Sequence, residues 1–106
     1  MSVYVTEYAA CAYFEKLVDH FFKILPMWEN QEQSLPAYLE SFQLEVTGCQ
    51  GVMRDKGSDA EFVTLLSILQ YFIDHPSCKT AVVRREVFHA ISICNALRNR
   101  CTKAVE

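Results

Sequence analysis

The residues best suited to chemistry lie around Pro76, where His75 and Cys78 are close neighbours in the chain. A cysteine in the first turn of a helix has a lowered pKa, because the helix N-terminus stabilises the thiolate. This makes Cys78 a candidate reactive thiol. Covalent catalysis also needs a base held beside the nucleophile, and the sequence identifies no dedicated partner for Cys78. We therefore predict that the chain is not an enzyme.

Metal and cofactor chemistry also lack a supporting pattern. His75 and Cys78 have spacing that could suit two zinc ligands, but the remaining candidates supply no second ligand pair at such spacing. These candidates are His20, His89 and Asp74. The 3 glycines are scattered and form no phosphate-binding loop. We predict neither a metal nor a cofactor.

The cysteines are typical of a protein kept in a reducing compartment. Their number is odd, no two have CxxC spacing, and a chain that is 51% hydrophobic needs no disulfides to form a core. We expect them to be reduced and mostly buried, as small core residues. They are Cys11, Cys49, Cys78, Cys94 and Cys101.

Two further features favour the cytoplasm. No basic residue precedes Lys16, so the charged start of a secretory signal is missing. The longest apolar runs, such as Phe62 to Leu69, are interrupted by polar residues and are far shorter than the roughly 20 residues that cross a bilayer. We expect a cytoplasmic protein that does not enter a membrane.

Charge is unevenly distributed along the chain. Residues 1–76 contain four basic and eleven acidic residues, a net charge of −7, whereas residues 77–106 contain six basic and two acidic residues, a net charge of +4. The segment between Lys23 and Arg54 holds no basic residue at all. An acidic surface steers the encounter with a basic partner, and Trp and Tyr are favoured anchors at interface centres. The candidate partner-binding residues are Trp28, Glu29, Glu32, Tyr38, Glu40 and Glu45.

The same charges permit two other interpretations. The acidic residues can instead form surface ion pairs with the basic C-terminal segment, and Trp28 can close one end of the core. Alternatively, the basic segment binds nucleic-acid phosphates. The overall charge of −3 counts against nucleic acid as the partner. The candidate nucleic-acid-binding residues are Arg84, Arg85, Arg98 and Arg100.

The elements that must position these residues are four predicted helices. Apolar residues at three- and four-residue steps predict that the first helix runs from Thr6, its cap, to Leu25. Pro26 is expected to end this helix and to leave Trp28 in the following loop. Ser34-Leu35-Pro36 predicts the start of the second, which continues to about Met53 and is weakened by Gly48 and Gly51.

The third helix is predicted from Asp59 to Asp74, after a capping box formed by Ser58 and Glu61. It is apolar nearly all round, which is typical of a central, covered helix. Pro76 closes it, Ser77 caps the fourth helix, and that helix runs from about Cys78 to Lys103. Apolar spacing predicts that its buried side consists of Val83, Val87, Ala90, Ile91, Cys94, Leu97 and Cys101. At about 1.5 Å per residue this fourth helix is about 39 Å long.

Short connections between helices favour antiparallel neighbours. We predict an all-α fold, a small antiparallel bundle of about four helices with a long last helix, as a single domain over residues 1–106; a homodimer is a variant of this arrangement. An acidic, compact chain without evident chemistry acts by binding. In size and charge it resembles small helical immunity proteins, and no family motif accompanies this.

The leading functional hypothesis is an inhibitor of the immunity or antitoxin type, which covers a basic toxin such as a nuclease. The alternatives are a secretion chaperone or assembly adaptor, which would present apolar grooves, and a nucleic-acid-binding regulator acting through the basic helix.

Overall fold

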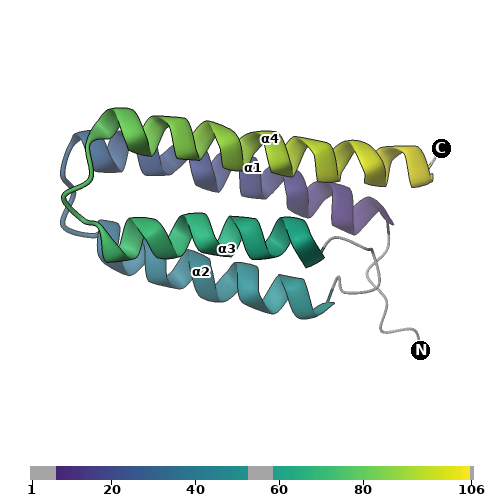
Figure 1. Cartoon of the computed structure of the whole chain (residues 1–106). Coiled ribbons are helices and arrows are strands. Elements are labelled where there is room, and N and C mark those ends of the chain that lie inside the picture. The colour runs from purple at the N-terminus through teal and green to yellow at the C-terminus, as the bar shows by residue number, and fades with distance from the viewer. Residues whose placement is uncertain (1–6, 53–58, 106) are drawn as a thin grey trace.

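The described part of the chain forms four helices that run in an up-down-up-down order (Figure 1). The computed structural model describes the backbone of residues 7–52 and 59–105 and the side chains of residues 11–51 and 59–100. The helices are α1 (Glu7–Glu29), α2 (Leu35–Val52), α3 (Asp59–Asp74) and α4 (Thr80–Val105). The predicted all-α antiparallel bundle with a long last helix is confirmed. Thr6, Met53 and Ser58, which the sequence analysis used as helix boundaries, lie outside the described residues.

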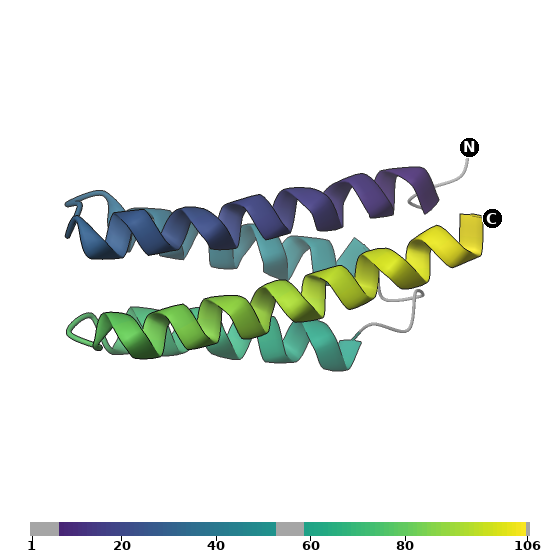
Figure 2. The same ribbon diagram turned by 90° about the horizontal axis from the view of Figure 1, so that it is seen from above.

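The bundle has two layers. Helices α1 and α4 pack along each other in one layer and α2 and α3 in the other, and the connections α1–α2 and α3–α4 lie at the same end of the molecule (Figures 1 and 2). At that end the termini of the four helices lie nearly level, and at the other end α1 and α4 extend beyond α2 and α3. The connections at the level end bring together residues from both halves of the chain.

All four helices contribute to one hydrophobic core. Aromatic side chains fill much of it: the rings of Phe21 and Phe42 lie 4.8 Å apart between α1 and α2, and Phe14 of α1 meets Phe62 of α3 at 6.2 Å. The buried side of α4 is the one that its apolar periodicity predicts. It consists of Val83, Val87, Ala90, Ile91, Cys94 and Leu97.

Helix α3 has the predicted bounds but not the predicted surroundings. Phe62, Leu65 and Leu69 are buried, whereas 55% of Val63 and 38% of Tyr71 remain exposed. A helix at the corner of a four-helix bundle has two neighbours, so one of its sides faces solvent. The expectation that α3 is covered nearly all round is therefore wrong.

Pro26 does not end α1, contrary to the sequence prediction. The helix continues to Glu29 with Pro26 inside it. Proline removes one backbone hydrogen bond and costs about 3 kcal/mol in a helix interior. Here it is followed by the buried side chain of Trp28, whose packing offsets that cost, and the Pro26 carbonyl still accepts a bond from Asn30 N–H at 2.9 Å.

Helix α4 begins two residues later than predicted, at Thr80. The Lys79 carbonyl accepts bonds from the N–H groups of Val82 and Val83, so Lys79 and not Ser77 is the boundary residue. Cys78 N–H instead bonds the His75 carbonyl at 3.0 Å, which closes a turn after α3. Cys78 consequently lies before the helix, not in its first turn.

Candidate functional site

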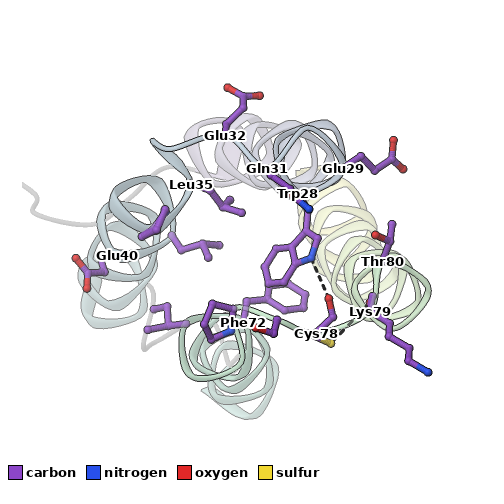
Figure 3. A pocket seen from close by; sticks show the side chains of 15 residues that line it. Trp28, Glu29, Gln31, Glu32, Leu35, Glu40, Phe72, Cys78, Lys79 and Thr80 are labelled. Carbon is purple, nitrogen blue, oxygen red and sulfur yellow. Dashed lines mark hydrogen bonds between the residues drawn. The ribbon is translucent and has the colours of Figure 1, made fainter.

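A cleft of about 800 Å³ opens at the end of the bundle that carries the α1–α2 and α3–α4 connections (Figure 3). We call it the end cleft. Residues from all four helix ends or their connections line it, so it unites segments that are far apart in the sequence. Its volume falls within the range of about 300–1,000 Å³ that is usual for binding pockets.

The interior of the end cleft is apolar. Trp28, Leu39 and Phe72 form its floor and are almost fully buried, and Leu35 and Ile73 are half-buried at its sides. The Trp28 and Phe72 ring centres lie 5.7 Å apart. Figure 3 shows the Trp28, Leu35 and Phe72 side chains directed inward. This floor is suited to an apolar group.

Trp28 is fixed by one hydrogen bond as well as by packing. Its indole Nε1–H donates to the Cys78 carbonyl oxygen at 3.1 Å, which ties the last turn of α1 to the α3–α4 connection. Only 7% of the side chain is exposed. The predicted loop position of Trp28 is wrong, and the alternative that it closes one end of the core describes what is observed. As a partner-binding residue it can act only as the floor of the cleft.

The rim of the end cleft is acidic. Three of the four predicted glutamates, Glu29, Glu32 and Glu40, line it, together with Lys79 from the opposite connection. The carboxylates of these glutamates point away from the interior (Figure 3). Glu29 pairs with Arg84 at 3.2 Å. Within the part of the chain that the structure describes, Glu32 and Glu40 form no ion pair.

Tyr38 and Glu45 do not belong to this cleft. The Tyr38 hydroxyl donates to the His20 carbonyl oxygen at 2.8 Å, and burial, followed by the charge of Glu45, raises the pKa of Tyr38 to about 12. Glu45 lies 4.0 Å from Nδ1 of His20, beside a second hollow that Lys16, Phe22 and Lys23 also line. Tyr38 and Glu45 thus contact α1 from α2. They lie apart from the cleft that Glu29, Glu32 and Glu40 line.

The four arginines of α4 do not form one basic patch. Arg84 pairs with Glu29 of α1, and Arg100 pairs with Glu61 of α3, so these two side chains reach to different neighbouring helices. Arg85 lies 3.6 Å from Glu86. Arg98 is half-buried, and at about 1.5 Å per residue it lies about 21 Å along α4 from Arg84. The predicted pairing of acidic residues with the basic helix is therefore observed for Glu29.

The residues around Pro76 show no nucleophile paired with a base. The imidazole of His75 stacks on the Tyr71 ring at 4.2 Å, and its Nδ1 lies 2.9 Å from the Tyr71 carbonyl oxygen. The Cys78 thiol instead contacts the Tyr71 hydroxyl at 3.8 Å and the Lys79 carbonyl at 3.7 Å. Imidazole and thiol thus have different polar partners. Cys78 also lies before α4 and not in its first turn, which is the position that the reactive-thiol prediction assumed.

Of the described cysteines, Cys94 is buried and Cys11, Cys49 and Cys78 are half-buried. Burial raises the pKa of Cys94 to about 12. Burial also raises the pKa of Cys49, to about 11, although the interaction of the thiol with the nearby Tyr13 hydroxyl opposes this change. The side chain of Cys101 lies outside the described residues. Buried thiols of this kind are protonated at neutral pH, which suits a role in packing.

Comparison of the chain with models of protein families, with curated proteins and with solved structures found no match. Among the described helices, none combines the length and the hydropathy required to span a bilayer. In the same part of the chain, no three or more His, Cys, Asp or Glu side chains gather in a way that could hold a metal ion. The end cleft is the feature on which a functional proposal can be built.

Proposed function

We propose that this protein is a binding inhibitor that acts in the cytoplasm by covering a basic surface of another protein, in the manner of immunity or antitoxin proteins. The toxin it would neutralise is a basic one, such as a nuclease. The end cleft and its acidic rim form the binding surface.

The observation that carries this proposal is the convergence of Glu29, Glu32 and Glu40 on one cleft, from the end of α1, the following connection and α2. Complementary charge accelerates the encounter of two proteins and determines their relative orientation. Carboxylates without an intramolecular partner are available for this purpose, and Glu32 and Glu40 are such groups in the described structure. The free thiols of Cys49, Cys78 and Cys94 support the cytoplasm as its place of action.

The test replaces the carboxylates of Glu32 and Glu40, which form no ion pair with other described residues. The double variant Glu32→Lys, Glu40→Lys is compared with Glu15→Lys, Asp19→Lys, which makes the same change in net charge at exposed positions of α1 outside the end cleft. Proteins captured from the native cell by the parent chain are identified by mass spectrometry, purified and titrated with all three forms. We expect the rim variant to bind at least about tenfold more weakly at low salt, and the α1 variant to bind about as well as the parent.

The captured partner should be basic, and its own activity should fall as the parent chain is added. Circular dichroism verifies that both variants keep their helices. Equal affinities of the rim variant and the parent, or an acidic partner, would remove the acidic rim as the binding surface. If the partner binds but keeps its activity, the proposed binding surface remains valid and the proposed inhibition is contradicted.

One observation favours an adaptor as a second candidate. Phe22 of α1 and Phe88 of α4 are 43% and 47% exposed, and their rings meet edge to face at 5.9 Å on the outer side of the α1–α4 layer. Exposed aromatic pairs are typical of protein contacts. If the protein is an adaptor, the variant Phe22→Ser, Phe88→Ser should lose partner binding that is insensitive to salt, whereas the rim variant should retain it.

The nucleic-acid alternative is disfavoured by the ion pairs of Arg84, Arg85 and Arg100, which engage these cations with Glu29, Glu86 and Glu61. Contacts to phosphates would have to replace these pairs. A salt-sensitive gel shift that is lost on replacing these arginines would restore the alternative.

A further inference from the structure

The acidic rim accounts for the attraction of a basic partner but leaves the apolar interior of the end cleft without a role. We propose that this interior receives one apolar side chain of the partner, carried on a segment whose neighbouring residues are Lys or Arg. The inference rests on the proposed function, because it names the part of a basic partner that the same site would bind.

The floor of the cleft is suited to such an anchor because it is rigid before binding. Trp28 is held by its hydrogen bond to the Cys78 carbonyl at 3.1 Å and by the Phe72 ring, so it does not have to be ordered when the partner arrives. A pre-organised pocket loses little conformational entropy on binding. Leu35 and Ile73 at the sides are half-buried, so the anchor would cover apolar surface that the free protein leaves partly exposed.

The arrangement of charge determines what surrounds the anchor. Glu32 and Glu40 lie on the rim with their carboxylates directed to solvent (Figure 3), and Glu29 is already engaged by Arg84. A chain that places an apolar side chain inside the cleft therefore runs past two carboxylates that lack a partner within the described structure. Cationic neighbours of the anchor complement them, whereas acidic neighbours would be repelled.

Trp28 lines the cleft and is the only tryptophan of the chain, so its fluorescence reports on binding in the cleft. Its fluorescence is measured while three synthetic peptides of equal length are added to the whole protein. The first carries Leu among Lys residues, the second has Ser in place of Leu, and the third has Glu in place of Lys. We expect the Lys/Leu peptide to change the emission and to bind at least about tenfold more tightly than either of the others, since only this peptide offers both an anchor and cations.

A substitution in the cleft supplies the second readout. Ser77 is exposed and lines the cleft, so Ser77→Phe should occupy the interior and weaken the Lys/Leu peptide at least about tenfold. Ser92→Phe makes the same change at an exposed position of α4 that does not line the cleft, and should leave the peptide affinity unchanged.

Three other outcomes would overturn the inference, and each has a different consequence for the proposed function. Equal binding of the Lys/Leu and Lys/Ser peptides would show that charge acts alone, which removes the anchor but leaves the proposed function. Equal binding of the Lys/Leu and Glu/Leu peptides would contradict both the cationic neighbours of the anchor and the proposed binding of a basic partner. If no peptide binds, or if Ser77→Phe binds like the parent, the anchor is wrong, and the capture experiment with the rim variants judges the proposed function independently.

Discussion

Tyr13 of α1 and Tyr38 of α2 place their hydroxyl groups in different surroundings. The Tyr38 hydroxyl donates to the His20 carbonyl oxygen at 2.8 Å. The hydroxyl oxygen of Tyr13 is buried without a hydrogen-bond partner of normal geometry in the described structure, and burial, together with the nearby Cys49 thiol, raises the pKa of Tyr13. A buried polar group without a partner costs about 1–3 kcal/mol of desolvation, whereas a made hydrogen bond stabilises by about 1 kcal/mol.

Removing the two hydroxyl groups should therefore have opposite effects. We expect Tyr13→Phe to raise the free energy of unfolding by about 1 kcal/mol and Tyr38→Phe to lower it by about 1 kcal/mol. Urea unfolding of both variants and the parent, followed by circular dichroism, measures the difference. A loss in Tyr13→Phe as large as that in Tyr38→Phe would show that the Tyr13 hydroxyl has a stabilising partner.

At the level of single residues, sequence reasoning identified which side chains are buried better than it identified their partners. The buried side of α4 follows from apolar spacing alone. In contrast, the hydrogen bond from Trp28 to the Cys78 carbonyl joins two segments that are 50 residues apart, and no local pattern specifies such a contact. The same holds for Glu29 and Arg84, whose pairing depends on the docking of α1 against α4.

Among the elements, the end of α1 shows why Pro26 misled the prediction. The helix closes with two paired bonds, from Glu32 N–H to the Met27 carbonyl at 3.0 Å and from Gln31 N–H to the Trp28 carbonyl at 3.1 Å. This pattern is the Schellman motif, in which the residue after the cap adopts a left-handed conformation and is usually glycine. Here that residue is Gln31, with φ of 50°. Without a glycine, the sequence carried no recognisable stop signal beyond the proline.

Gln31→Gly should stabilise the protein, because glycine adopts this conformation without the steric cost that a Cβ atom imposes. We expect a gain of about 0.5–1 kcal/mol in the free energy of unfolding, measured by thermal and urea unfolding. The matched control is Gln33→Gly, two residues further along the same connection, where the backbone is not left-handed. There, glycine only adds freedom to the unfolded chain and should lower stability. Parallel changes in the two variants would contradict the strain assigned to Gln31.

Other boundaries followed from the sequence because their signals are local. Pro36 in a first turn marked the start of α2 at Leu35, and the bounds of α3 agree with the prediction at both ends. The start of α4 did not follow, since the turn that bonds Cys78 N–H to the His75 carbonyl competes with a cap at Ser77. The end cleft could not be predicted either, because it exists only where two connections meet at one end of the assembled bundle.

For the molecule as a whole, the largest pKa changes belong to groups inside the bundle. Burial raises the pKa of Cys94 from its ordinary value of 9.0 to about 12, and that of Cys49 from 9.0 to about 11. The thiolate is thus disfavoured in the folded state. When the pH exceeds 9, the unfolded chain loses these protons and the folded chain keeps them, so unfolding becomes more favourable.

The free energy of unfolding should consequently be insensitive to these thiols below pH 9.0 and fall as the pH rises toward about 12, by about 1.4 kcal/mol per pH unit for the Cys94 thiol. Cys49, which is only half-buried, contributes in the same direction up to about pH 11. Cys94→Ala should make the fall less steep by about that amount, whatever its effect at neutral pH. Urea unfolding across this range, with reductant present, measures both slopes. Val87→Ala, at another fully buried position of α4, is the control: it should lower stability equally at every pH. A slope in Cys94→Ala equal to that of the parent would mean that the Cys94 thiol ionises in the folded bundle as readily as in the unfolded chain, which its complete burial argues against.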